Sequence, residues 1–118
     1  MRRGEIWLAR FDPAQGSEVT KTRPCVIVSN DASNRVVERL RRGVITVVPL
    51  TSNTARVYDF QTLIKVTGTN GLAVDSKAQA EQIRSLNHER LVERLGQLPR
   101  EVMAALDAAI AVHLSLDL

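Results

Sequence analysis

A chain of 118 residues with 44% hydrophobic and 25% charged residues has the composition of a single globular domain, expected to span residues 1–118. No apolar run approaches the roughly 20 residues of a membrane helix, which excludes that class. The first residues carry no signal-peptide pattern, so we expect a cytoplasmic protein. The single cysteine, Cys25, excludes an intramolecular disulfide and a cysteine-rich zinc site, and its apolar neighbours favour a core position.

The charge of the chain is moderately basic. The formal net charge is +3, and 13 of the 16 cationic side chains are arginine. Arginine presents forked donors that suit phosphate contacts, although codon usage in a GC-rich genome would produce the same bias. Aromatic residues make up only 3% of the chain, which argues against a base-stacking sheet. Any nucleic-acid binding is therefore expected to depend on charge and hydrogen bonds.

Four segments are predicted to form strands because they are rich in β-branched and apolar residues: Glu5–Phe11, Cys25–Ser29, Gly43–Leu50 and Phe60–Val66. The second begins with an uninterrupted apolar run, which is typical of a strand buried on both faces. Pro24 precedes this run and favours an extended conformation at Arg23, so a permanent charge stands at the mouth of the strand. This arrangement indicates an anion site, and the alternative is a surface arginine in an ordinary loop.

The other segments are predicted to be helical or irregular. Asn30–Arg42 is expected to be a loop with one or two helical turns, because arginines crowd its few apolar positions. Helix propensity favours a helix in Ala73–Ser85, and leucine spacing favours one or two turns in His88–Leu95. Pro99–Leu116 is predicted to be an amphipathic terminal helix with Pro99 in its first position. Together these elements predict a mainly β (α+β) fold, a small barrel or half-open sheet capped by a helix.

Five blocks of sequence occur together in a recognisable order and spacing. They are RRGEIW (2–7), FDPAQGSE (11–18), TRPCVIVSN (22–30), VVPLTSN (47–53) and AEQIRS (80–85). Together they resemble the MazF/PemK family of toxin endoribonucleases from toxin–antitoxin pairs. The chain departs from the family pattern at Cys25, where an aliphatic residue or alanine is usual, and in the arginine-rich insertion Arg35–Arg42.

The resemblance implies an SH3-like barrel of the kind shared with the CcdB toxins, working as a homodimer. It also implies cleavage of single-stranded RNA without a metal or other cofactor, and a MazE-like antitoxin whose extended tail blocks the RNA groove. The catalytic residues that it implies are Arg23, Thr51 and Glu18. It assigns Glu81–Ile83 to a strand that lines the groove, in place of the helix that propensity favours. The RNA-binding residues that we expect are Lys21, Ser52, Asn53, Ser76, Lys77, Glu81 and Gln82.

The chemistry expected of these residues uses the nucleophile that RNA itself carries. The 2′-hydroxyl would attack the adjacent phosphorus and leave a 2′,3′-cyclic phosphate and a 5′-hydroxyl end. Arg23 would stabilise charge on the phosphoryl oxygens, and Thr51 would add a hydroxyl donor. Glu18 would act as the base or orient Arg23. His88 and His113 could suggest an acid–base pair, but a core or a surface position is the favoured interpretation for both.

Two functions from other classes remain open at this point. A CcdB-like inhibitor of DNA gyrase would act through the terminal helix without catalysis, and a plain nucleic-acid-binding barrel would also fit the charge. We expect a homodimer whose interface uses the apolar end of the terminal helix and strand edges near Val44–Pro49. We also expect a small acidic partner whose disordered tail folds into the cationic groove. Asp75 and Lys77 are predicted to form a solvated pair beside a turn.

Overall fold

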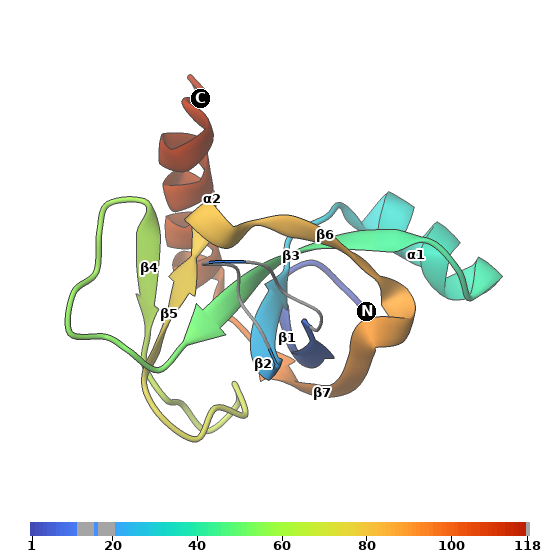
Figure 1. Cartoon of the computed structure of the whole chain (residues 1–118), viewed down its shortest axis with the longest axis horizontal. Coiled ribbons are helices and arrows are strands. Elements are labelled where there is room, and N and C mark those ends of the chain that lie inside the picture. Colours follow the sequence, from blue (N-terminus) through green and yellow to red (C-terminus); the bar gives the residue numbers. More distant parts are fainter. Residues whose placement is uncertain (12–15, 17–20, 118) are drawn as a thin grey trace.

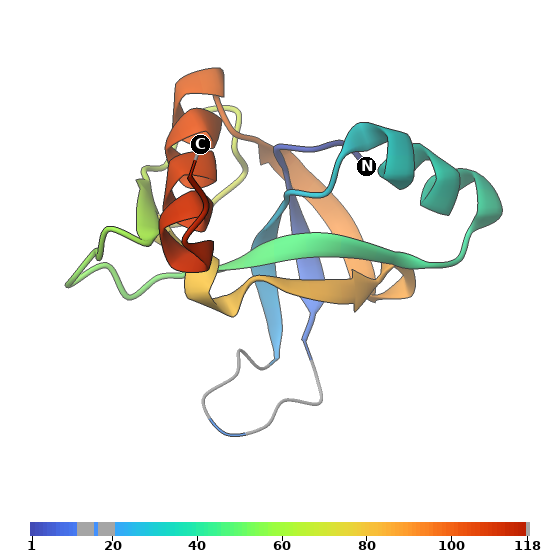
Figure 2. The same ribbon diagram turned by 90° about the horizontal axis from the view of Figure 1, so that it is seen from above.

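The protein folds into a curled antiparallel sheet with a helix on either side. The computed structural model describes residues 1–11, 16 and 21–117. Among the described residues, six of the seven strands follow the order β4-β5-β3-β2-β1-β7, and the seventh, β6, pairs with β3 outside this order. Figures 1 and 2 show α1 and α2 on opposite sides of the sheet. The elements are β1 (Glu5–Arg10), β2 (Thr22–Ile27), α1 (Asp31–Leu40), β3 (Val44–Thr51), β4 (Gln61–Ile64), β5 (Ser76–Gln79), η1 (Ala80–Gln82), β6 (Arg84–Asn87), η2 (His88–Arg90), β7 (Leu91–Gln97) and α2 (Arg100–Leu114).

The strand β2 is buried on both faces, as the apolar run predicted. Cys25 and Ile27 belong to a core cluster that includes Phe11 and Ile45, whereas Val26 packs in a second cluster with Leu106 of α2. The strand begins three residues earlier than expected because it pairs with β1 from Thr22 onward. The other three predicted strands are confirmed within a few residues of their predicted ends. The sheet therefore separates two clusters, and β2 contributes to both.

The segment Asn30–Arg42 contains the helix α1, to which the insertion contributes Arg35–Leu40. This helix is longer than the one or two turns that we predicted. The helix α1 has ten residues, close to three turns at about 3.6 residues each. The Asn30 side chain caps it by accepting a hydrogen bond from the Ser33 N–H at 2.8 Å. The buried Asn34 amide donates to the Ser29 carbonyl at 2.9 Å. These local bonds anchor the helix at its first turn.

The C-terminal half contains more strand than propensity predicts. The helix predicted in Ala73–Ser85 is wrong, because β5 and β6 pair with β3 on either side of the short turn η1. Glu81 and Gln82 lie in that turn, so the strand that the family resemblance implied for Glu81–Ile83 is also wrong there. The helical prediction for His88–Leu95 fails beyond η2, since β7 pairs with β1 along its length. Pairing with a buried strand overrides the local preference.

The helix α2 covers the second cluster. Its Leu106 is fully buried, and Val102, Met103 and Ile110 pack against the same core. Pro99 is the capping residue before the helix rather than its first residue. The predicted apolar face ends before Leu114, which is 47% exposed. None of the helices among the described residues has the length and apolar character that a membrane crossing requires.

Strand β3 is an inner strand of the sheet. It pairs with β2 on one side and with β6 and then β5 on the other. In the described part of the chain the path of the sheet ends at β4 and β7. The edges of β3 itself are therefore paired. Strand β6 pairs with β3 from Val44 to Val47 and with no second strand in the described part of the chain, so the outer edge of β6 is the strand edge near Val44–Pro49. The Val44 side chain is 60% exposed.

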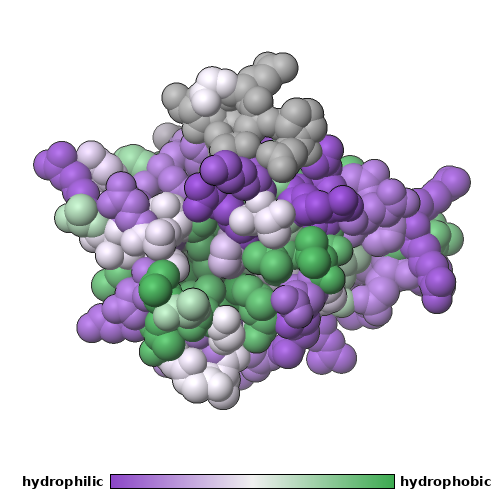
Figure 3. Space-filling model, turned by 60° about the horizontal axis from the view of Figure 1, so that its bottom comes forward, coloured by the Kyte–Doolittle hydropathy of each residue, from purple (hydrophilic) through white to green (hydrophobic). Residues whose placement is uncertain are grey.

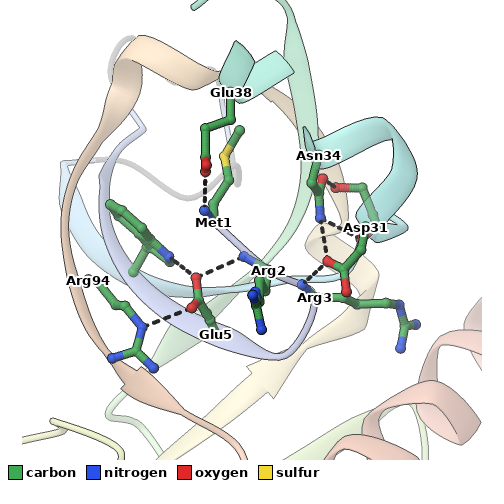
Figure 4. A network of polar contacts seen from close by, with 10 residues as sticks. Met1, Arg2, Arg3, Glu5, Asp31, Asn34, Glu38 and Arg94 are labelled. Carbon is green, nitrogen blue, oxygen red and sulfur yellow. Dashed lines mark hydrogen bonds and ion pairs between the residues drawn. The ribbon is translucent and has the colours of Figure 1, made fainter. Parts of the chain in front are cut away.

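A polar network fastens the start of the chain to the barrel (Figure 4). The Glu5 carboxylate accepts hydrogen bonds from Trp7 Nε1 at 2.9 Å, from the Arg2 N–H at 2.8 Å and from Arg94 Nε at 2.9 Å. Burial raises the pKa of Glu5, but these three hydrogen bonds outweigh it and leave the pKa below its ordinary value. The Asp31 carboxylate accepts from the Arg3 N–H at 2.7 Å, and this bond lowers the pKa of Asp31.

Candidate active site

The candidate site lies where β2 and β3 separate. Their ladder pairs Ile27 with Val47 and ends with Cys25 opposite Pro49. Pro24 and Pro49 have no N–H to donate, so two adjacent prolines weaken the ladder at this point. Beyond it, β2 stays paired with β1 and β3 turns to β5. The two prolines therefore open a mouth between neighbouring strands.

Arg23 and Thr51 stand on the two sides of this mouth. The β2–β3 register, continued by two residues, sets Arg23 opposite Thr51, and Thr51 itself pairs with Lys77 of β5. Side chains at directly opposed positions point to the same face of a sheet. Arg23 and Thr51 are both half-buried. The continued register indicates that the predicted guanidinium and hydroxyl lie at one level, on the two strands that part here.

The surroundings of Thr51 orient its hydroxyl. Thr51 Oγ1 accepts a hydrogen bond from the Asn53 N–H at 3.3 Å, and Asn53 Oδ1 accepts from the Ala55 N–H at 3.4 Å. A hydroxyl that accepts one bond still has its own hydrogen to donate, so Thr51 keeps the donor that the mechanism needs. Ser52 and the Asn53 side chain are exposed beside it. This part of the predicted RNA-binding set lies at the site.

Lys77 does not have the surroundings that the sequence suggested. Its side chain is only 8% exposed, and Nζ donates to the Arg56 carbonyl at 2.6 Å and lies 5.9 Å from the Tyr58 ring centroid. The Asp75 carboxylate instead accepts from the Val66 N–H at 2.8 Å. The solvated Asp75–Lys77 pair is therefore wrong. Lys77 is therefore not a free cation at the surface; it holds the loop between β3 and β4 through its bond to the Arg56 carbonyl.

Glu81 is held in a fixed orientation by Gln61. Its Oε2 accepts a hydrogen bond from Gln61 Nε2 at 2.7 Å, and its Oε1 is buried without a hydrogen-bond partner. Gln82 follows in the same turn, η1. The Ser76 side chain is 5% exposed and donates to the Val74 carbonyl at 3.1 Å, so its hydroxyl is already engaged.

The remaining predicted residues, Glu18 and Lys21, precede β2 in the sequence. Lys21 is exposed, has a left-handed backbone (φ 66°) and accepts a hydrogen bond from the Phe11 N–H through its carbonyl at 2.8 Å. Glu18 lies outside the described residues. Its role as the base or as the group that orients Arg23 stays a prediction.

Arg84 of β6 is a cation to which the sequence patterns assigned no role. It pairs with Val47 across β3, and its guanidinium carbon lies 5.7 Å from the centroid of the Phe11 ring. Its Nη1 is buried without a hydrogen-bond partner. The only signal in the sequence was a charge next to Ile83 in the AEQIRS block.

Other catalytic arrangements find no support in the described part of the chain. No group of three or more histidine, cysteine or acidic side chains there is arranged to hold a metal ion. His88 lies in η2 and His113 near the end of α2, on opposite sides of the molecule (Figure 1), so they form no acid–base pair. Burial raises the pKa of Cys25 to about 12, which keeps its thiol protonated and unreactive.

A pocket of about 260 Å³ adjoins Arg23. It lies between the two separating strands and the loop before β5, and its polar side chains are Arg23, Ser52 and Ser76. On the face seen in Figure 3, hydrophobic side chains surround a hollow near the centre and hydrophilic side chains border it. Arg23 thus borders a small recess whose apolar residues Leu50, Leu72 and Leu95 belong to the cluster under α2.

The antiparallel barrel carries an arginine and a threonine where two inner strands separate. This arrangement fits the class of small toxin endoribonucleases that the sequence blocks resemble. The chain belongs to the family of PemK-like, MazF-like toxins of type II toxin–antitoxin systems, because the model of that family matches residues 2–114. It is 57% identical to Endoribonuclease MazF9 of Mycobacterium tuberculosis over 116 residues, which is 98% of each chain. The predicted family is thereby confirmed.

Comparison with solved structures confirms the predicted fold class. A crystal structure of MazF from Deinococcus radiodurans is 27% identical, with a TM-score of 0.80 over 98% of this chain and 96% of that one. An endoribonuclease in complex with its cognate antitoxin, from a mycobacterial species, is 22% identical with a TM-score of 0.77 over 100% and 98% of the two chains. At that identity the second likeness shows the fold alone.

Proposed function

We infer that this protein is the toxin of a type II toxin–antitoxin pair and acts as an endoribonuclease. The observation that carries this conclusion is the 57% identity, over 98% of the chain, to a protein named as an endoribonuclease. The family match over residues 2–114 supports the same class. A CcdB-like gyrase inhibitor without catalysis would not need a guanidinium and a hydroxyl at one level of two strands, so the site favours RNA cleavage.

The proposed reaction is the transfer of a phosphoryl ester within single-stranded RNA. The 2′-oxygen bonds to the adjacent phosphorus, the bond from phosphorus to the 5′-oxygen breaks, and the 2′-proton leaves to a base. The 5′-oxygen takes up a proton, which gives a 2′,3′-cyclic phosphate and a 5′-hydroxyl end. Protein side chains and the RNA hydroxyl supply every group in these steps, so the reaction is proposed to proceed without a metal.

Arg23 and Thr51 have the chemistry for the phosphoryl oxygens. A guanidinium keeps its charge at all working pH values and donates two parallel hydrogen bonds to a phosphate. Thr51 adds a donor from the neighbouring strand, and donors fixed in advance are worth most where negative charge develops. Glu18 is proposed as the base or as the group that orients Arg23. Lys21, Ser52, Asn53, Glu81 and Gln82 are proposed to contact RNA, whereas the buried Lys77 and Ser76 act through the segments that they hold.

We propose two protein partners in the cytoplasm. The first is a cognate antitoxin of the MazE kind, with an acidic disordered tail that competes with RNA for the cationic site. Complexes of related toxins with their antitoxins, in mycobacteria and in Deinococcus radiodurans, support this partner. The second is another copy of this chain, joined through the exposed apolar side chains between α1 and α2.

The test of the proposed reaction uses purified protein, mixed single-stranded RNA and a metal chelator. Sequence-specific cutting that leaves 2′,3′-cyclic phosphate ends is expected. An RNA with a 2′-deoxy nucleotide before the cut should stay intact, because its nucleophile is missing. Cutting of the deoxy substrate would contradict the internal nucleophile, while intact RNA together with inhibited DNA supercoiling would support the gyrase alternative.

A further inference from the structure

Lys77 lies beside Thr51 in the sheet and binds the loop that follows Thr51. The β3–β5 register pairs the two residues, and the Lys77 side chain is only 8% exposed. Its Nζ donates a hydrogen bond to the Arg56 carbonyl at 2.6 Å. We propose that Lys77 is a positioning residue, which fixes the loop of residues 52–60 and, through this loop, the Thr51 hydroxyl. The inference rests on the RNA cleavage proposed above.

A closed chain of contacts connects Lys77 with the Thr51 hydroxyl. Thr51 Oγ1 accepts a hydrogen bond from the Asn53 N–H at 3.3 Å, and Asn53 Oδ1 accepts one from the Ala55 N–H at 3.4 Å. Ala55 precedes Arg56, whose carbonyl is bound to Lys77, and Lys77 returns to Thr51 through the pairing of β3 with β5. The orientation of the hydroxyl is thus linked to the position of the Arg56 carbonyl.

The loop between β3 and β4 has no buried side chain of its own to anchor it. Residues 52, 53 and 55–59 are exposed, and residues 54 and 60 are half-buried, so none of these nine described residues lies in the core. The position of the loop therefore depends on polar contacts with the sheet. Near its far end, Gln61 Oε1 accepts a hydrogen bond from the Tyr58 N–H at 3.1 Å. Lys77 holds the half of the loop that is nearer to Thr51.

The burial of Lys77 makes its contact with the Arg56 carbonyl costly to break. A buried ammonium is stable only where hydrogen bonds replace its hydration, so loss of the carbonyl would leave a buried charge without that partner. Nζ also lies 5.9 Å from the Tyr58 ring centroid, within the roughly 6 Å at which a ring face attracts a cation. The loop is thus held before RNA binds, as a preorganised donor requires. At this depth Nζ is poorly placed to contact a phosphate itself.

The test is a double-mutant cycle between Lys77 and Thr51. Lys77→Met keeps an unbranched side chain of similar length and removes the donor, whereas Lys77→Arg keeps a charged donor. Each substitution is made in the wild type and in Thr51→Ala, and kcat and KM for cleavage of single-stranded RNA are measured in the presence of chelator. Lys65→Met is the matched control, because Lys65 is exposed directly after β4 and carries the same charge.

We expect Lys77→Met to lower kcat by about tenfold or more with KM nearly unchanged, because a small displacement of a catalytic donor is enough for such a loss. Lys77→Arg should lose less activity than Lys77→Met, and Lys65→Met should match the wild type. In the Thr51→Ala background, Lys77→Met should cost less than about twofold, since no hydroxyl remains to be positioned. Equal losses in both backgrounds would overturn the proposal. So would a rise in KM at unchanged kcat, which would indicate direct contact with RNA.

Hydrogen exchange separates this proposal from the proposed activity. If the wild type cuts no RNA, the activity fails, and the positioning is judged from the amide protons of Asn53 and Ala55, which are bonded within the loop. Faster exchange of these protons in Lys77→Met than in Lys65→Met would support the role of Lys77. Equal exchange in the two variants would overturn it.

Discussion

At the scale of single residues, the catalytic proposal depends on the guanidinium group of Arg23 and the hydroxyl group of Thr51. Arg23→Ala and Thr51→Ala should each lower kcat for RNA cleavage by about 10² or more, because each removes a donor aimed at developing charge. RNA binding should change less. Arg23→Lys keeps the charge but loses the bidentate geometry, so we expect it to recover little activity. Single-turnover kinetics with a separate binding assay measures both quantities.

The matched control for this loss is Arg100→Ala. Arg100 is exposed at the first residue of α2, so the substitution removes the same charge away from the mouth between β2 and β3. Its kcat should stay near that of the wild type. An equal loss in Arg100→Ala would show that net charge, and not the position of Arg23, governs cleavage.

Glu5 supplies a prediction about pH. Its folded pKa is lowered below the ordinary value of 4.5, so ionised Glu5 stabilises the fold above that pH. The stabilisation is lost as the pH falls through the folded pKa. Glu5→Gln should therefore lower the free energy of unfolding at neutral pH and flatten its decline below pH 4.5, as urea titrations at several pH values would show. Glu101→Gln, at an exposed carboxylate of α2, should keep the wild-type slope.

At the scale of elements, the loop before β5 is fixed to β7 by two glycines. A Cβ at Gly71 would lie 2.1 Å from the Leu95 carbonyl oxygen, and one at Gly96 would lie 2.3 Å from the Thr69 carbonyl oxygen. Gly71 also has a left-handed backbone, with φ +69°. Gly71→Ala should lower the free energy of unfolding by about 1–3 kcal/mol, measured by chemical denaturation. Gly68→Ala should change it by less than about 0.5 kcal/mol, and equal effects would contradict the close packing.

The elements that the sequence predicted well are those whose own residues decide their structure. β2 follows from its apolar run, and α2 follows from its apolar spacing and Pro99. β7 was missed because its leucines at helical spacing are turned into a strand by pairing with β1. The burial of Lys77 was missed for a similar reason, since the Arg56 carbonyl that it binds lies 21 residues away. Long-range partners decide such cases, and a local pattern carries no record of them.

The family resemblance supplied what local patterns did not. It named Arg23 and Thr51 together, and the register of β2 and β3, continued by two residues beyond its last pair, puts them at one level. It gave no sign of the recess beside Arg23, because the wall of that recess comes from segment 71–74, which carries none of the recognised blocks.

At the scale of the whole molecule, an open surface between α1 and α2 fits a second copy of the chain. It encloses about 740 Å³ and includes Val44, Ile110 and Leu116, with Val44 60% and Leu116 51% exposed. Figure 2 shows the two helices standing apart, with α2 near one end of β3 and α1 near the other. An apolar surface of this kind is typical of an interface between subunits.

Val44→Asp should shift the protein from a dimer toward the 13.1 kDa monomer in sedimentation experiments at micromolar concentration, because it places a charge in the interface. Val92→Asp provides the control, since Val92 is 52% exposed on β7. A wild type that sediments only as the monomer would remove the dimer proposal.

The burial of Cys25 makes the rate of its alkylation a measure of how often β2 opens. Cys25 is the only thiol in the chain, it is fully buried in β2, and its pKa of about 12 leaves almost no reactive thiolate. An alkylating reagent can therefore modify the folded chain only during moments when β2 comes away from β1 or β3. The rate of alkylation therefore reports how often the strand that carries Arg23 opens. RNA or antitoxin that binds to this strand should lower that rate, and the measurement needs no added label.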